Sequence, residues 1–318
     1  MPAQLICPDT GVALPTWTCP TTGRQFPTGM TSTPQQRMLA ALRATPFVAS
    51  TTPPDNYGFF PVKRSMFHND RYGICVTSEE MFTKTCTNPE IDIDVLDQVG
   101  FAWAKGHGVT NGASLDEVCD WMVQKGFQIG PQLYNDGPWA SVDYTNDTIL
   151  KAAIYEGGPV KIAIPASRLP GGAGSSDGFW SLNGNGGGSD HCVALNAYGT
   201  AQYVFDSLKI PLPSGLPAQT FGYALYTWST IGFVGPNWVK GVLDEAMVRK
   251  PTTVGVPPLA PPVPPTPPIP PAITGTIYAQ YIGSNIVIKG EIATVDGSHY
   301  LATPIGGGFY KFVPVPVL

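Results

Sequence analysis

The stretch Asn69-Asp-Arg-Tyr-Gly-Ile-Cys75-Val-Thr-Ser-Glu-Glu-Met-Phe82 is the most informative part of this chain. It predicts a helix that begins at Cys75. A helix N-terminus stabilises negative charge, so a thiol placed there is favoured to ionise. Far downstream, Ser189-Asp-His-Cys-Val-Ala-Leu-Asn-Ala-Tyr-Gly199 predicts a strand that opens at His191. A helix-opening thiol paired with an imidazole that takes its proton is the arrangement of a thiol hydrolase.

The composition indicates a loop-rich α+β protein. The chain has 318 residues, of which 13% are charged, with 36 glycines and 34 prolines. Its net charge is -5, and no basic cluster is visible, which argues against a nucleic-acid partner. No segment has the apolar length of a membrane span, and no basic region followed by an apolar core opens the chain. The localisation is left open, with a virion or a bacterial cell surface as possibilities.

Composition divides the chain into four expected segments. Residues 1–53 form a Pro/Thr-rich N-terminal extension, and residues 54–250 have the pattern of a compact domain. Residues 251–273 form a Pro-rich linker, which favours an extended polyproline II rod. Residues 274–318 alternate as a small β-rich module that is too short for ready independent stability. Docking or self-association would supply the missing burial, so the module is typical of an anchor.

Several local signals predict elements inside the central segment. Ser114-Leu-Asp-Glu117 is a capping box for a helix that ends at Gly126. A second helix is expected over 147–156, before two glycines. The β-branched, aromatic and apolar content predicts strands at 160–164, 192–198 and 223–228. A Gly-rich loop, residues 169–188, separates the first two of these strands. A loop of that length is typical of a functional site or of a mobile segment.

The cysteines and acidic residues predict no metal site and no cofactor. Two similar stretches occur near the N-terminus, Cys7-Pro-Asp-Thr-Gly11 and Cys19-Pro-Thr-Thr-Gly23. A metal knuckle needs four ligands, and no histidine or further cysteine lies near these two cysteines. A disulfide between them, or two exposed turns, remain open. The acidic run 92–97 lacks the glycine and distal glutamate of a calcium loop, so it predicts a solvated helix start. Buried free thiols are expected at Cys86, Cys119 and Cys192.

The order of these elements, over about residues 54–235, resembles the papain-like cysteine peptidase superfamily. Asn69 lies six residues before Cys75, where that family carries an amide, although usually a glutamine. Gly73 matches a family glycine two residues before the nucleophile, whereas Val76 replaces the family's aromatic residue just after it. The resemblance implies a papain-like α+β fold.

The same resemblance implies roles for three side chains. Cys75 would be the nucleophile and His191 the general base. Asn69, together with the Cys75 backbone N–H, would form the oxyanion hole. The substrate would be a peptide or a cell-wall peptide.

The residue that orients the histidine is left with two alternatives. The family expects Asn or Asp on the strand after the histidine strand. Asp206 lies at a suitable interval, yet its neighbours also fit a helical face. If residues 223–228 form the strand in question, the position falls at Trp228 or Ser229, which are neither amide nor carboxylate. The second alignment is slightly favoured, and it implies a Cys/His dyad or a weakened site.

Two functions therefore compete at the level of sequence. The first is a cysteine hydrolase that cleaves a peptide or isopeptide/amide bond, with the Gly-rich loop, Trp180 and Trp228 as walls of its cleft. The second is a papain-like scaffold used as a non-catalytic structural or attachment protein on a phage particle or bacterial surface. The rod, the β module and the imperfect third residue favour the second.

Overall fold

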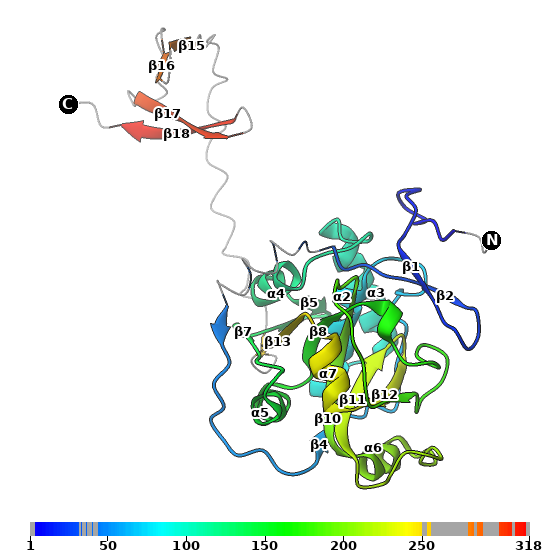
Figure 1. The fold of residues 1–318 in the computed structure, drawn as a ribbon. Helices are drawn as coiled ribbons and strands as arrows, with labels where there is room; N and C mark the ends of the chain where they lie inside the picture. The colour runs from blue at the N-terminus through cyan, green and yellow to red at the C-terminus, as the bar shows by residue number, and fades with distance from the viewer. Residues whose placement is uncertain are drawn as a thin grey trace. The chain divides into compact units, whose positions relative to one another are not determined.

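The computed structural model describes residues 4–31, 33, 36, 40 and 44–249, and five short stretches of strand beyond them (Figure 1). The chain divides into two compact units, Met1–Pro257 and Pro258–Leu318. Helices and strands are mixed along the first unit, so the α+β class expected from the composition is confirmed.

A mixed sheet of nine strands forms the centre of the first unit. Its order is β3-β7-β13-β8-β10-β11-β12-β9, with β4 paired to β10. Two pairs, β3 with β7 and β9 with β12, are parallel, and the others are antiparallel. The strands are β3 Thr45–Pro46, β4 Tyr57–Gly58, β7 Trp139–Ser141, β8 Val160–Ile164, β9 Trp180–Ser181, β10 His191–Thr200, β11 Phe221–Thr227, β12 Thr230–Val234 and β13 Glu245–Arg249.

Two smaller sheets and a set of helices complete this unit. β5 Phe127–Ile129, β6 Gln132–Asn135 and β14 Thr253–Gly255 form one sheet, and β1 Thr16–Thr18 pairs with β2 Gln25–Pro27. The helices are α2 Cys75–Thr87, α3 Ile93–Gly106, α4 Leu115–Gln124, α5 Asp147–Gly157, α6 Ala201–Leu208 and α7 Pro236–Val242. Side chains cap α3, α4, α5 and α6 at their N-termini, because each helix leaves backbone N–H groups without intrahelical partners there.

Alternation along β10 divides the interior into two cores. Cys192 and Ala194 pack on the side that carries α2, α3 and α4, whereas Val193 and Leu195 pack on the side that carries α5 and α7. Successive strand residues point to opposite faces, and both faces of this strand are covered. A bulge between Leu195 and Ala197 shifts the register with β11.

Most local predictions for the central segment are confirmed. The Ser114 side chain caps α4 by accepting from the Glu117 N–H, and Gly126 follows with a positive φ. α5, β8, β10 and β11 lie where a helix and three strands were expected. The acidic run opens α3, with Asp92 as its cap.

The terminal segments are described only in part. Within residues 34–43, only residues 36 and 40 are described, and of the Pro-rich linker expected over 251–273 only residues 253–255 are described. The C-terminal unit contains the hairpins β15 Ala279–Ile282 with β16 Asn285–Ile288 and β17 His299–Gly306 with β18 Phe309–Val315. The boundaries of the four segments and the self-association of the module stay predictions. Among the described residues, no helix has both the length and the apolar character to cross a membrane.

Helix α2 is buried although it is rich in polar residues. Every residue from Cys75 to Lys84 is buried, including Glu79 and Glu80. These acids meet basic side chains of the sheet: Arg249 donates to Glu79 at 2.9 Å and to Glu80 at 3.2 Å, and Lys161 donates to Glu80. Lys84 of α2 pairs with Asp136, which follows β6. Three acids and three bases therefore form one buried ion cluster, comprising Glu79, Glu80, Lys84, Asp136, Lys161 and Arg249.

The charges of this ion cluster are held by one another. Burial alone would raise the pKa of Glu80, but Arg249, Lys161 and Lys84 together lower it to about 2. Burial likewise works against the charged form of Lys161, and the neighbouring acids overcome it and raise its pKa. Removal of one member therefore leaves an opposite charge buried without compensation.

We expect Lys161→Met to destabilise the first unit strongly. The variant leaves Glu80 and Glu79 with one fewer buried cation, and breaking a buried pair in this way costs about 3–5 kcal/mol of unfolding free energy. Urea denaturation measures the loss. Lys240→Met is the matched control, because Lys240 pairs with Asp147 at 2.8 Å in a half-exposed position, where a pair contributes less than about 1 kcal/mol. Equal losses in the two variants would contradict the structural importance of the cluster.

Candidate active site

Cys75 is the first residue of α2, and its thiol is completely enclosed. The residue is 1% exposed. Its sulfur accepts a hydrogen bond from the Cys192 N–H at 3.4 Å, and the nearby backbone N–H groups of Gly29 and Val76 also act to lower the pKa of the thiol. Burial nevertheless dominates and raises the pKa of the thiol to about 12. The helix N-terminus thus does not produce the thiolate that the sequence indicated, because the sulfur is sealed from water.

His191 opens β10 and is also buried and neutral. Its Nε2 lies 2.9 Å from the Thr227 Oγ1, and its ring stacks on Trp228 with centroids 4.2 Å apart. Burial lowers the pKa of the imidazole to about 3. The Nδ1 atom has no hydrogen-bond partner and forms none with the Cys75 sulfur. The structure brings Cys75 next to β10, but its thiol and the imidazole of His191 are not hydrogen-bonded.

The side chain at hydrogen-bond distance of the imidazole is that of Thr227, one position before Trp228 in the favoured sequence alignment. Asp206 lies on α6, beyond the far end of the ten-residue β10, where it accepts from Gln202. A strand of that length spans roughly 30 Å, which separates Asp206 from His191. The side chain at hydrogen-bond distance of His191 thus comes from β11, the strand that contains the favoured alternative of the sequence analysis. The sequence signal that could have identified Thr227 is strand alternation, because Thr227 lies on the same face of β11 as Leu225.

Trp228 and Ser229 form the two-residue turn that joins β11 to β12. Both have positive φ, of 41° and 62°. Such turns favour Asn-Gly, and a bulky residue at positive φ is strained. Stacking of the Trp228 indole compensates for this strain, because the His191 ring lies against it and the Phe26 ring stacks on it with centroids 4.6 Å apart. Strain of this kind concentrates at functional sites.

Asn69 lies beside the thiol. Its side chain is buried, and its Oδ1 has no hydrogen-bond partner. It lines a very small cavity, of about 10 Å³, together with Cys75, Thr227 and Trp228. The two residues before it, Phe67 and His68, have positive φ, so the backbone is strained on the way into the site. Asn69 is therefore close enough to Cys75 to share a cavity with it.

The Gly-rich loop supports the N-terminal extension. Its Ser175 hydroxyl lies 3.4 Å from the Cys19 sulfur, and Asp177 pairs with Arg64 at 2.5 Å. Trp180 forms β9 at the edge of the sheet and pairs with β12. The loop therefore packs against the β1–β2 hairpin. The sequence analysis had predicted it as a wall of a cleft.

The two N-terminal cysteines are free and lie in separate turns. The alternative of a disulfide between Cys7 and Cys19 is wrong, and both sulfurs are buried although the turns around them are exposed. Burial would raise the pKa of Cys19, but hydrogen bonds from Ser175 and Thr22 lower it to about 6. Cys86, Cys119 and Cys192 are free as expected, and Cys119 and Cys192 are buried, whereas Cys86 is half-buried. In the described part of the chain, no group of three or more His, Cys, Asp or Glu residues is placed to hold a metal ion.

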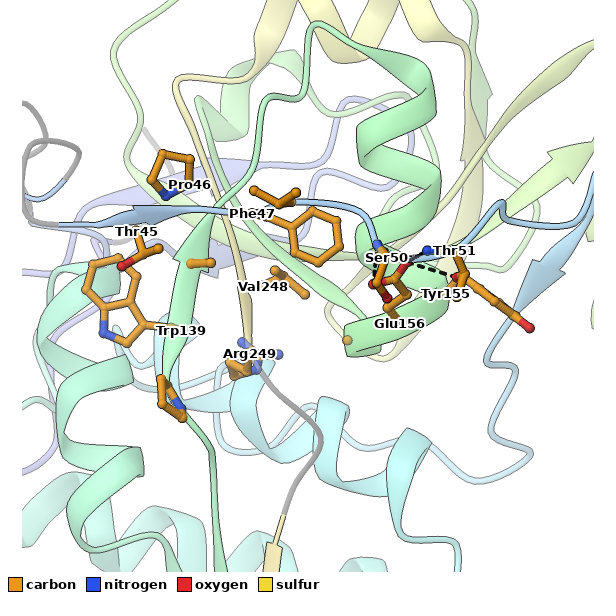
Figure 2. Close-up of a pocket in the computed structure, with 14 residues that line it drawn as sticks. Thr45, Pro46, Phe47, Ser50, Thr51, Trp139, Tyr155, Glu156, Val248 and Arg249 are labelled. Atoms are coloured by element: carbon orange, nitrogen blue, oxygen red, sulfur yellow. Dashed lines mark hydrogen bonds between the residues drawn. The ribbon is translucent and has the colours of Figure 1, made fainter.

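A larger groove lies away from Cys75 (Figure 2). It has a volume of about 800 Å³ and is lined by residues 45–51, Trp139 and the end of α5. Its carboxylate, Glu156, accepts from the N–H groups and hydroxyls of Ser50 and Thr51, as the dashed lines show. Glu156 thus fastens the segment after β3 to α5.

Comparison with solved structures finds proteases at low identity. The ragweed pollen allergen Amb a 11, a cysteine protease in its proform, matches with 12% identity over 67% of this chain and 72% of that chain, at a TM-score of 0.46. Digestive procathepsin L 3 of Tenebrio molitor larval midgut matches with 13% identity over 71% and 83%, at 0.39. The cysteine protease and lectin-like domains of Cwp84, a surface layer associated protein of Clostridium difficile, match with 11% identity over 72% and 61%, at 0.42.

These matches are of the kind that the resemblance in the sequence predicts. At these identities and TM-scores, nothing about activity or substrate follows from them. No family model and no curated protein matches the chain.

The buried imidazole predicts a pH dependence of stability. The pKa of His191 falls from 6.5 to about 3 on folding, so the unfolded chain binds the extra proton between these values. The contribution is fully present above about pH 6.5 and is lost as the pH falls toward 3. We expect the unfolding free energy to lose about 2–3 kcal/mol from this group between pH 7 and pH 4.5.

Urea denaturation at the two pH values measures this loss, and His191→Leu should remove that part of it. Thr18→Ala, at an exposed hydroxyl on β1, is the control and should leave the loss unchanged. An identical pH dependence in wild type and His191→Leu would contradict the buried neutral histidine.

Proposed function

We propose that this chain is a cysteine hydrolase that cleaves a peptide or isopeptide bond with Cys75 as nucleophile. One observation carries the proposal. The thiol that opens α2 lies against the first residues of β10, where Thr227 holds the imidazole of His191. Asn69 shares the cavity of the thiol. The groups that we assign as nucleophile, base, orienting group and oxyanion donor come from three segments of the chain, residues 69–75, the start of β10 and the end of β11.

The hydrogen bond to Thr227 defines what the histidine does. When Nε2–H donates to the Thr227 hydroxyl, Nδ1 carries the lone pair that accepts the Cys75 proton. The thiolate then attacks the substrate carbonyl, and the Asn69 amide and the Cys75 backbone N–H donate to the resulting oxyanion. His191 returns the proton to the leaving amine, and water then hydrolyses the thioester.

A threonine holds this tautomer less firmly than an amide oxygen or a carboxylate does. A carboxylate only accepts, whereas a hydroxyl also donates, and a donating Thr227 would place the proton on Nδ1. We therefore expect Thr227→Val, which removes the hydroxyl at nearly constant shape, to lower kcat by about tenfold to a hundredfold, within the range of general-base contributions. Thr18→Ala, an exposed hydroxyl on β1, is the control. An unchanged kcat would exclude Thr227 from the mechanism.

Cleavage of a mixed peptide library, read by mass spectrometry, tests the proposal. Cys75→Ala and His191→Ala should abolish cleavage, whereas Cys86→Ser, at a free thiol away from the site, should retain it. The enclosed thiol does not preclude detection. If about one molecule in a thousand has an open site at any time, a typical turnover of about 10 s⁻¹ still gives about one cleavage per hundred seconds. Cleavage that survives Cys75→Ala would refute the proposal.

One observation favours the second function, a scaffold without catalysis. Thiol and imidazole are both neutral, and no hydrogen bond joins them. A structural or attachment role, as on a phage particle or bacterial surface, would need no more than this packing. Absence of any cleavage by wild type over days, together with alkylation of Cys75 that is indifferent to His191, is the result that this alternative expects.

A further inference from the structure

Residues 28–31 lie directly over the candidate nucleophile as an extended segment. The Gly29 carbonyl accepts from the Ala113 N–H at 2.9 Å, and the Thr31 N–H donates to the Ala113 carbonyl at 3.1 Å. The Met30 N–H donates to the carbonyl of Asp190, the residue before the histidine, at 3.1 Å. The segment is thus bound through its main chain to both walls of the site, in a parallel bridge between Met30 and Ala113.

Gly29 lies close to the sulfur, and only glycine fits there. Its backbone N–H is near enough to the Cys75 sulfur to interact with it. A Cβ at this position would lie 1.8 Å from the Gly73 carbonyl oxygen, far inside van der Waals contact with backbone atoms. The wall is equally tight, because a Cβ on Gly112 would meet the Thr31 methyl at 2.3 Å. Glycines on both sides permit the close approach of two backbones.

The β1–β2 hairpin, which directly precedes residues 28–31, anchors this segment. Trp17 and Phe26 stack on Trp228, with centroids 5.1 and 4.6 Å away, and Trp228 in turn stacks on His191. The Phe26 ring also rests on Gly174 of the Gly-rich loop. In Figure 1 the β1–β2 hairpin lies far from α6, and α6 follows the end of β10 that is opposite to His191.

We propose that residues 28–31 act as an internal ligand of the candidate active site, and that the site binds an extended peptide with glycine over the thiol. Cys75 becomes reactive when this segment leaves. The role of this segment in controlling Cys75 rests on the proposed function, whereas the position of residues 28–31 over the thiol rests on the contacts above. The segment also escapes attack in this pose, because Gly29 presents its N–H to the sulfur while its carbonyl is engaged by Ala113.

Alkylation of the full chain by iodoacetamide at pH 8, mapped by mass spectrometry, tests the occupancy. Gly29→Ala forces the segment off Gly73, so we expect Cys75 to react at least about tenfold faster than in wild type, equivalent to about 1.4 kcal/mol less opening free energy. Gly106→Ala is the matched control, because a Cβ there meets nothing within 4 Å. Cys119, buried in α4, reports global unfolding and should stay protected. An unchanged Cys75 rate in a folded Gly29→Ala variant would overturn the proposal.

Wild type decides the question if the Gly29→Ala variant does not fold. In graded urea, the proposal requires Cys75 to react at lower urea than Cys119, since departure of the segment exposes the site without unfolding the core. Identical urea dependence of the two thiols would overturn it.

A peptide supplied in trans tests the preference for glycine. The synthetic peptide Gln-Phe-Pro-Thr-Gly-Met-Thr-Ser-Thr, which copies residues 25–33, should slow alkylation of Cys75 in the Gly29→Ala chain at least about fivefold at saturation. The same peptide with alanine in place of its glycine should not. Equal protection by both peptides would overturn the glycine preference.

A second substitution separates this inference from the proposed function. If the opened Cys75 reacts at the same rate with and without His191→Ala, the hydrolase proposal fails while the internal ligand stands. If wild type cleaves peptides through Cys75 while Gly29→Ala leaves its alkylation unchanged, the hydrolase proposal stands and the internal ligand fails.

Discussion

The buried ion cluster is the constraint on which the rest of the structure depends. Helix α2 runs through the interior with ten consecutive buried residues, and apolar contacts alone do not hold it, because Glu79, Glu80 and Lys84 lie among them. Arg249 of β13 and Lys161 of β8 meet these charges. Buried ion pairs add little net stability, but a misplaced helix would leave a charge unpaired, so the cluster specifies one position of α2 against the sheet. That position places the first residue of the helix, Cys75, against the first residues of β10.

The electrostatics of the site follow from enclosure. Water reaches neither Cys75 nor His191, so desolvation outweighs the helix N-terminus and keeps both groups neutral. The enclosing layer is part of the chain itself. A continuous aromatic stack leads from His191 through Trp228 to the β1–β2 hairpin, and the strained turn at Trp228 is retained because its indole completes that stack. Packing of the N-terminal extension and protonation of the site are therefore two aspects of one arrangement.

Elements with short-range signals were predictable. The cap at Ser114 and the apolar spacing after it depend on neighbours within one helical turn, and the strand at 160–164 is marked by its own β-branched and apolar content. The starts of α2 and β10, and with them Cys75 and His191, were predictable for the same reason. Thr227 was missed by one residue, because its contact with His191 depends on the register between β10 and β11, with a bulge between them. The position of residues 28–31 could not be predicted, since this segment is held by main-chain hydrogen bonds that any sequence with suitable glycines can make.

The sequence by itself determined the α+β class, the order of the elements and the residues that open α2 and β10, because periodicity, caps and turn residues act over a few positions. The tertiary structure alone decided which groups meet. Ion pairs such as that between Lys161 and Glu80 join residues 81 positions apart, and the bond between Gly29 and Ala113 crosses 84. It also decided the protonation of the site, because the pKa of a buried group depends on the water excluded by every segment packed around it.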